Sequence, residues 1–194
     1  MKKFLVFMAD GTEEIEALTV VDYLRRSDIL VDTVSINGTY EIVSSHDIKI
    51  KTDKKMEEIK EDDYMGLYVP GGTKGAMALR DDKRVRDLVK NFFDDKKIVS
   101  AICAGPIVLE KAGVLENKRA TSFPAMEDEF KNIGEYVKDE LVVIDGNLIT
   151  SRGAGATIYL SLKLIELIKG EDAKESLKPN IQQNFVEEYF SFKF

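Results

Sequence analysis

Residues 98–109 read IVSAICAGPIVL, in which one cysteine and two small residues separate two apolar runs. The first run, residues 98–102, has the length and the branched side chains of a buried strand. The second run begins at Pro106, a residue favoured in the first turn of a helix, and Gly113 can close that helix. The segment therefore predicts a strand, a sharp turn at Cys103 and a helix, which is one unit of a parallel α/β sheet.

Apolar runs and helical spacings alternate along the rest of the chain, so we expect a mostly parallel sheet with helices around it. Asp10 or Thr12 can cap the first helix. The side chains expected on its buried face are Ile15, Leu18, Val21 and Leu24. The other expected elements are strands at 4–8, 29–36 and 67–69 and helices around 85–92 and 156–169.

Three short segments between these elements carry their own signals. Asn37-Gly38 is a strong two-residue turn, and it predicts a hairpin that leads into the apolar run around Ile42. Asp145-Gly146-Asn147 predicts a second hairpin within residues 141–150. Residues 54–60 are expected to form a short exposed helix.

No internal repeat or linker interrupts the pattern, so residues 1–194 are expected to form a single domain. Residues 173–194 are an aromatic extension that is too apolar for a free tail. We expect this extension to dock on the body of the protein or on a second subunit.

The composition excludes several classes of protein. The chain has 194 residues, 44% hydrophobic and 32% charged, with a formal net charge of -7, which is typical of a globular protein large enough to bury a core. There is no Lys/Arg stripe, so we expect no nucleic-acid partner and no membrane partner. No apolar run is long enough to span a bilayer and the N-terminus does not read as a signal peptide, so a cytoplasmic protein with a reduced thiol is expected.

Candidate functional residues lie where strands meet helices, because backbone N–H groups point into the crevice there. Cys103 occupies such a turn, as in a nucleophile elbow, and the helix N-terminus should lower its pKa. The alternative is that Cys103 is a buried small hydrophobic residue. With one cysteine and one histidine in the chain, we expect neither a disulfide nor a metal site.

Glu16, Gly72 and Ala104 could complete a site around this thiol. An ionised Glu16 beside the sulfur would oppose thiolate formation, so the useful state is a buried, protonated carboxyl group that donates to sulfur. The alternative is an exposed acid that complements the helix dipole, which is how we interpret Glu13 and Glu14. The N–H groups of Gly72 and Ala104 could form an oxyanion hole, although a Gly-Gly pair also suits an ordinary turn.

Four motifs together resemble the DJ-1/PfpI superfamily, in particular its branch of Parkinsonism-associated redox proteins and their bacterial relatives. They are DGTEEIE at 10–16, VPGG at 69–72, AICAGP at 101–106 and TSRGAG at 150–155, in the family's order. The resemblance covers residues 2–170, and the combination is far more specific than any single motif. It implies a flavodoxin-like three-layer sandwich, similar to class I glutamine amidotransferases, and a homodimer.

The resemblance also implies roles for individual residues, with no cofactor. These are Cys103 as nucleophile and oxidation-sensitive thiol, Glu16 as its protonated partner, and Gly72 and Ala104 as amide donors. Gly71 and Arg152 are further candidates for the lining of the site. Members of the family are described as cofactor-independent glyoxalases, deglycases, redox-regulated chaperones and oxidative-stress sensors.

The chain departs from the family pattern at the position where that branch commonly has a histidine near the thiol. Phe123 stands there and cannot transfer a proton. The only histidine, His46, falls in a loop from which relatives bring a basic residue to the partner's site, together with Arg26. The alternative for His46 is a solvated loop residue. A protease function is disfavoured, because Ala104 stands where the related proteases have a histidine. An amidotransferase function is disfavoured, because the His-x-Glu motif of the related amidotransferases is absent.

Three hypotheses follow. In the first, the chain is a glyoxalase III-like or deglycase-type enzyme that acts on a small reactive carbonyl compound such as methylglyoxal. In the second, it is an oxidative-stress sensor or redox-regulated chaperone without significant turnover, in which Cys103 becomes a sulfinate held by Glu16. In the third, it is a catalytically silent binding domain on a common fold.

Overall fold

A computed structural model describes residues 2–194, and its centre is a seven-stranded sheet in the order β10-β11-β7-β6-β1-β2-β5. Every neighbouring pair in this sheet is parallel except β10 and β11. The strands are β1 (Lys3–Met8), β2 (Val31–Ser35), β5 (Lys54–Lys55), β6 (Tyr64–Val69), β7 (Ile98–Ile102), β10 (Val142–Asp145) and β11 (Leu148–Ser151). The expected mostly parallel α/β architecture is confirmed.

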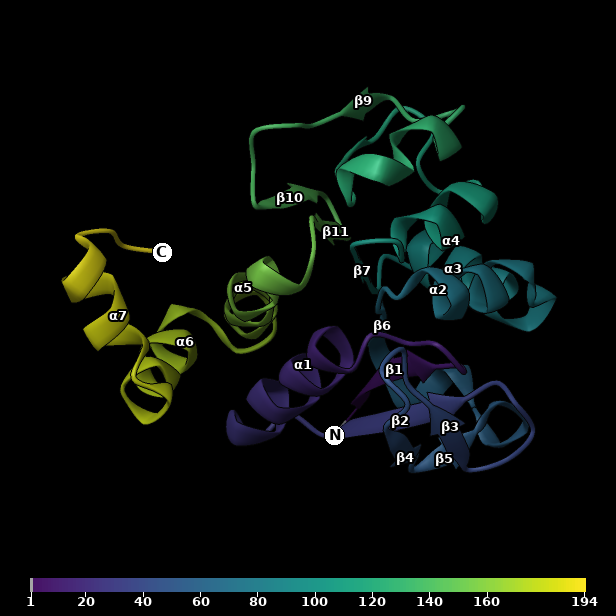
Figure 1. The fold of residues 1–194 in the computed structure, drawn as a ribbon, viewed down its shortest axis with the longest axis horizontal. Helices are drawn as coiled ribbons and strands as arrows, with labels where there is room; N and C mark the ends of the chain where they lie inside the picture. Colours follow the sequence, from purple (N-terminus) through teal and green to yellow (C-terminus); the bar gives the residue numbers. More distant parts are fainter. Residues whose placement is uncertain (1) are drawn as a thin grey trace.

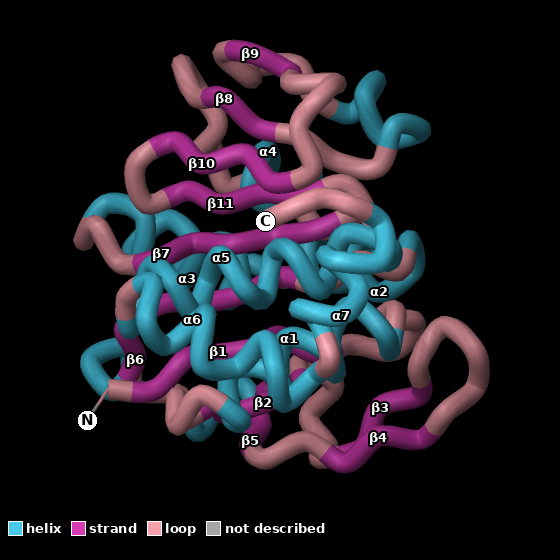
Figure 2. Tube along the Cα trace, turned by 90° about the vertical axis from the view of Figure 1, so that its left-hand side faces the viewer, coloured by secondary structure: helices cyan, strands magenta, loops and turns pink. Residues whose placement is uncertain are grey.

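Helices cover both faces of this sheet (Figure 1). The helices are α1 (Glu14–Arg26), α2 (Thr73–Asp81), α3 (Lys83–Asp94), α4 (Pro106–Lys111), α5 (Thr157–Lys169), α6 (Glu171–Leu177) and α7 (Gln183–Phe190). Figure 2 shows α1, α5, α6 and α7 in front of the strands. Helices α2, α3 and α4 cover the opposite face, so the molecule has the three layers expected of a flavodoxin-like sandwich.

The alternation of side chains along β1 explains why both faces are covered. Phe4, Val6 and Met8 pack with the apolar residues of α1 and α5, whereas Leu5 and Phe7 pack with those of α2, α3 and α4. All five side chains are fully buried. Because successive residues of a strand point to opposite faces, a continuous apolar run requires a layer on each side.

Four short strands lie outside this sheet: β3 (Glu41–Val43) pairs with β4 (Lys49–Lys51), and β8 (Arg119–Ala120) pairs with β9 (Glu135–Tyr136). The predicted hairpin at Asn37-Gly38 is therefore wrong. Strand β2 is hydrogen-bonded to β1 on one side and to β5 on the other, so it has no free edge for β3. The β3–β4 pair instead projects beyond the sheet (Figure 2).

Two further expectations differ from the structure. Residues 54–60 form the edge strand β5 and then a 3-10 helix at Met56–Glu58, with Met56 buried, rather than an exposed helix. In α1, Ile15 and Leu18 are exposed. The buried face of α1 consists of Glu16, Ala17, Val20, Val21 and Leu24. The acidic side chain of Glu16 is therefore on the buried face of α1, where the spacing of apolar residues had placed Ile15 and Leu18.

The aromatic extension packs partly on the body. Phe194 and Phe192 meet Tyr159 of α5 edge-on, with ring centroids 4.8 and 6.1 Å apart. Buried Lys178 donates to the carbonyl oxygen of Phe194 at 2.7 Å and pairs with Glu187 at 3.1 Å. The aromatic residues of α7 that remain exposed are Phe185, Tyr189 and Phe190. Within residues 2–194, no helix combines the length and apolar content needed to cross a bilayer.

Candidate active site

Cys103 lies immediately after β7, at the turn that leads into α4. Its φ of 60° is in the left-handed region, which is rare for residues other than glycine, asparagine and aspartate. The strained turn is fixed on both sides: the N–H of Cys103 donates to Ser151 at 3.0 Å, and its carbonyl oxygen accepts from the N–H of Phe123 at 2.9 Å. The side chain remains only partly buried. This is the geometry of a nucleophile elbow, which holds a reactive side chain up from the sheet.

Glu16 projects from the first turn of α1 toward this thiol and is 1% exposed. Its Oε2 atom accepts a hydrogen bond from the N–H of Gly71 at 2.9 Å, and the carboxyl group also interacts with the Cys103 thiol. The hydroxyl group of buried Tyr68 donates to the main-chain carbonyl of Glu16 at 3.0 Å. Strand β6 and the loop after it therefore bind both the main-chain carbonyl and the side-chain carboxyl group of Glu16.

Gly71 allows the two side chains to meet. A Cβ atom at this position would overlap Oε2 of Glu16 and would lie 2.7 Å from Cβ of Cys103. Both contacts are closer than real carbon atoms approach, so any larger residue would push the carboxyl group and the thiol apart. Gly71 is therefore a steric requirement of the pair.

The surroundings raise the pKa of both groups. Burial raises the pKa of Glu16 to about 7, and the charge of Glu13 contributes, although hydrogen bonds from Cys103 and Gly71 oppose the rise. Burial and then the charge of Glu16 raise the pKa of the Cys103 thiol to about 12. The two groups titrate as a pair, which loses one proton near pH 7 and keeps the other to much higher pH.

The expectation that the helix N-terminus lowers the thiol pKa is therefore wrong. Helix α4 has only six residues. Loss of water around the sulfur and the adjacent Glu16 carboxylate both disfavour the thiolate, and together they outweigh the short helix. When Glu16 carries the shared proton, its charge no longer opposes the thiolate.

Two backbone amides face the sulfur and act in the opposite direction. The N–H groups of Ala104 and Gly72 interact with Sγ of Cys103 and favour the thiolate. Gly72 has a φ of 84°, and a Cβ atom there would lie 2.6 Å from the backbone nitrogen of Glu13. The strand-to-helix loop can therefore bring its amide to the sulfur only with glycine at this position.

Phe123 and Arg152 lie beside the site and have different surroundings. Phe123 is 47% exposed, and its ring lies 3.6 Å from the position that a Cβ atom on Gly153 would occupy. The guanidinium group of Arg152 donates to the carbonyl oxygen of Lys138 at 2.6 Å and to Thr121 at 3.4 Å. Phe123 is therefore adjacent to the thiol turn through its backbone, whereas Arg152 is bound to a neighbouring loop.

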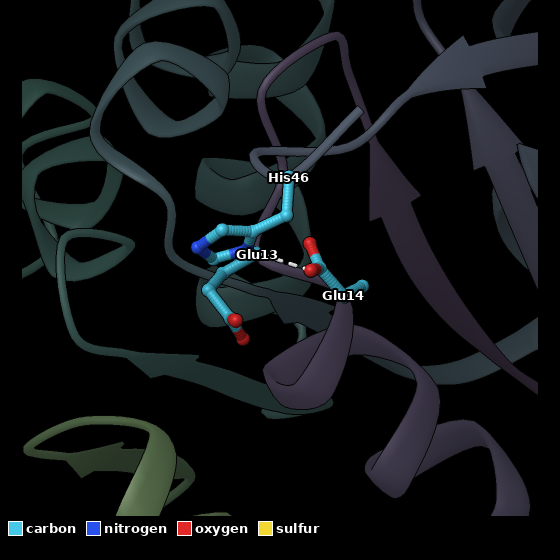
Figure 3. A group of neighbouring side chains, drawn as sticks. All are labelled: Glu13, Glu14 and His46. Atoms are coloured by element: carbon cyan, nitrogen blue, oxygen red, sulfur yellow. Dashed lines mark hydrogen bonds and ion pairs between the residues drawn. The ribbon is translucent and has the colours of Figure 1, made fainter. Parts of the chain in front are cut away.

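His46 and Arg26 do not meet the thiol of their own chain. Nδ1 of His46 lies 2.6 Å from Glu14, and these two side chains gather with Glu13 at the start of α1 (Figure 3). Glu14 binds His46 and Glu13 caps α1, so contacts within the protein account for this cluster and we assign no metal to it. Arg26 pairs with Asp22 at the far end of α1, about 15 Å along the helix axis from Glu16.

The cap of α1 is Glu13, not Asp10 or Thr12. Its carboxylate accepts from the N–H of Glu16 at 2.8 Å. Asp10 instead accepts from the N–H of Val43 in β3, and Thr12 accepts from the N–H of Ala9. The sequence interpretation of Glu13 as a merely exposed acid missed this contact, although the three-residue spacing of Glu13 and Glu16 is that of a helix cap and the backbone N–H that donates to it.

A cysteine at a strained strand-to-helix turn, a buried carboxyl partner and two facing amides define an α/β sandwich protein of the nucleophile-elbow type. The family profile that matches residues 2–167 is that of the DJ-1/PfpI family, so the chain belongs to the DJ-1/PfpI family. The resemblance carried by the four motifs is thereby confirmed.

Named relatives agree with this assignment. Protein dj-1beta of Drosophila melanogaster is 37% identical over 171 residues, which are 88% of this chain and 91% of that protein. Its homologue in Schizosaccharomyces pombe, named glutathione-independent glyoxalase DJ-1, is 32% identical and matches over 89% of this chain and 94% of that protein. The crystal structure of Drosophila DJ-1beta superimposes with a TM-score of 0.90 at 35% identity, covering 94% of this chain and 98% of that chain.

Proposed function

We propose that this protein is a cofactor-independent, glyoxalase-type enzyme that converts small α-oxoaldehydes such as methylglyoxal, or their adducts, into hydroxy acids. The observation that carries the proposal is the meeting of Cys103 and Glu16 over Gly71, with the amides of Ala104 and Gly72 facing the sulfur. The name of the Schizosaccharomyces pombe relative, a glutathione-independent glyoxalase, supports the same substrate class.

The first step requires the singly protonated pair with its proton on Glu16. The Cys103 thiolate then adds to the aldehyde carbon, forming a carbon–sulfur bond and an alkoxide. The amides of Ala104 and Gly72 stabilise the negative oxygen, and the carboxyl group of Glu16 gives it a proton. The product of this step is a neutral hemithioacetal beside a Glu16 carboxylate.

The second step moves hydrogen from the first carbon of the substrate to the second. The Glu16 carboxylate takes the proton from the carbon attached to sulfur, forming an enediolate, and returns it to the neighbouring carbon, while the hydroxyl proton moves from the first oxygen to the second. This leaves a thioester of the hydroxy acid, which water hydrolyses to free acid and thiol. The balance is one α-oxoaldehyde and one water consumed for each hydroxy acid, with no net oxidation, and a pKa near 7 suits Glu16 to both giving and taking a proton.

A second function is favoured by the lack of an imidazole group at the thiol. Phe123 stands beside the Cys103 turn, and His46 is bound to Glu14 at the start of α1. Glu16 is then the sole side chain among the described residues that is placed to move protons at the sulfur, so turnover would be slow. In that case Cys103 acts as a peroxide sensor whose sulfinate accepts a hydrogen bond from protonated Glu16.

The test compares lactate formation from methylglyoxal by wild type and by Cys103→Ser, with peroxide-treated protein analysed by mass spectrometry. The enzyme proposal expects lactate from wild type and none above the uncatalysed rate from Cys103→Ser. The sensor proposal expects ready conversion of Cys103 to a sulfinate and lactate no faster than without protein. Lactate formation that survives Cys103→Ser would contradict both.

We further propose that the protein is a homodimer built on α1. Ile15 and Leu18 are 55% and 40% exposed on this helix. With Ala154, Gly155 and Ile158 they line a groove of about 430 Å³ between α1 and the start of α5. A second copy of the chain would cover these apolar side chains, which a monomer leaves in water.

A further inference from the structure

Glu13, Glu16 and Gly71 are joined in a closed ring of hydrogen bonds. The N–H of Glu13 donates to the carbonyl oxygen of Gly71 at 3.1 Å. The N–H of Gly71 donates to the carboxyl group of Glu16 at 2.9 Å, and the N–H of Glu16 donates to the carboxylate of Glu13 at 2.8 Å. Each residue therefore fixes the other two, and the Glu16 carboxyl group depends on all three bonds for its place over the thiol.

Glu13 also differs from its neighbour Glu14 in its electrostatic partners. Glu14 is paired with His46 and accepts a hydrogen bond from Ser45, and hydrogen bonds from its backbone, Ser44, Ser45 and His46 lower its pKa to about 2 despite the opposing effect of burial. Within residues 2–194, no lysine, arginine or histidine forms an ion pair with Glu13. His46 lies within 4.8 Å of Glu13 without pairing with it, and the charge of Glu13 acts on the adjacent Glu16 carboxyl group.

We propose that Glu13 is a positioning residue of the thiol site, which holds the Glu16 carboxyl group in place through the ring and, through its charge, keeps the shared proton on the Glu16–Cys103 pair. The inference rests on the proposed function, because it concerns the same thiol and carboxyl group. Its charge effect agrees with the contribution of Glu13 to the raised pKa of Glu16.

The groups that face this pair come from few elements. Tyr68 of β6 is buried below it, and burial keeps its pKa well above the usual value, so it stays neutral. Glu14 and His46 gather with Glu13 at the start of α1 (Figure 3). A change at Glu13 alters a carboxylate that is bonded to the N–H of Glu16, whereas a change at Glu14 alters a carboxylate that binds Ser45 and His46 and takes no part in the ring.

The experiment measures the rate of Cys103 alkylation by iodoacetamide against pH, together with the melting temperature, for wild type and three variants. Glu13→Gln keeps an oxygen that can cap α1 but removes the charge. Glu13→Ala removes both. Glu14→Gln is the matched control, because it removes a carboxylate one residue away that is not in the ring.

Glu13→Gln is expected to shift the alkylation midpoint to lower pH by roughly half a unit, because removal of a like charge makes the pair easier to deprotonate. Its melting temperature should stay near that of wild type, and Glu14→Gln should leave the midpoint unchanged. Glu13→Ala should shift the midpoint and lower the melting temperature.

An unchanged midpoint in Glu13→Gln would overturn the charge effect and leave Glu13 as a helix cap only. An unchanged melting temperature in Glu13→Ala would overturn the positioning role. Because alkylation needs no substrate turnover, neither result depends on whether the protein is a glyoxalase. Failure of the proposed function would instead appear as absent lactate formation with the midpoint shift intact.

Discussion

The carboxyl group of Glu16 and the thiol of Cys103 meet over Gly71, although the two residues follow β1 and β7, on either side of β6, and are 87 positions apart in the chain. Glu16 is fully buried on α1, and Cys103 stands at a strained turn after β7. Because both groups prefer to keep their protons, the pair loses one proton near pH 7 and shares the other. This shared proton is the basis of the chemistry proposed for the site.

Burial of Glu16 should make stability depend on pH. Its pKa in the folded protein is raised to about 7 from an ordinary value of 4.5, so the stabilising effect of the protonated form is present below pH 4.5 and is lost as pH rises to 7. The free energy of unfolding of Glu16→Gln, taken as a difference from that of wild type, should therefore rise by up to about 3 kcal/mol between pH 5 and pH 8. Urea unfolding at both pH values measures this gain, and an equal difference at both would contradict it.

Gly71→Ala should disable the site by steric overlap with Glu16 and Cys103. We expect a loss of about 1–3 kcal/mol in the free energy of unfolding, as for other overpacked sites, and loss of lactate formation. Gly155→Ala is the control, because no heavy atom outside its chain neighbours lies within 4 Å of a Cβ atom there. Wild-type turnover by a folded Gly71→Ala protein would show that the close approach is not needed.

Phe123→His should test whether a missing imidazole group limits turnover. The backbone N–H of Phe123 is hydrogen-bonded to the carbonyl oxygen of Cys103, so a histidine there could assist proton transfer at the thiol. Such general acid–base assistance typically accelerates a reaction about 10²-fold or more when the geometry is good. We expect faster lactate formation that still requires the thiol. Phe185→His, on exposed α7, is the control. Unchanged or slower turnover by a folded Phe123→His protein would make Phe123 a packing residue only.

Leu18→Arg should separate the proposed dimer, because it places a charge in the apolar groove of α1. Light scattering at micromolar concentration should give the mass of a dimer for wild type and of a monomer for Leu18→Arg. Met77→Arg is the control, since Met77 is similarly exposed on α2, on the other face of the sheet. A monomeric wild-type protein would reject the proposal.

The sequence predicts the central elements of this fold because their signals are local. Continuous apolar runs mark β1 and β7, and the Ala-Gly-Pro that follows Cys103 marks the start of α4. Strand pairing is not local: Asn37-Gly38 suits a hairpin, yet β2 is already paired on both edges. Periodicity also misassigned Ile15 and Leu18, because it does not register a buried carboxylate on the inner face of a helix.

For the candidate site too, local sequence signals predict some features and contacts between distant segments decide the others. The motifs identify Cys103, Glu16 and the glycines as candidates, but the shift in thiol pKa depends on a side chain that the fold brings from α1. Burial and a nearby charge reverse the effect expected from the helix terminus. The closed ring that includes Glu13 likewise requires the loop after β6 to meet the start of α1, and sequence spacing alone does not show that contact.

The most direct test of the central claim compares lactate formation and thiol alkylation in Glu16→Gln, with Glu14→Gln as the matched control. Glutamine keeps a hydrogen-bond donor beside the sulfur but cannot transfer a proton, and it removes the charge that raises the thiol pKa. We predict that Glu16→Gln loses about 10²-fold or more in lactate formation while its Cys103 is alkylated at pH 8 at least as fast as in wild type. Wild-type lactate formation by Glu16→Gln, or an equal loss of both activities, would contradict the claim that Glu16 moves the proton.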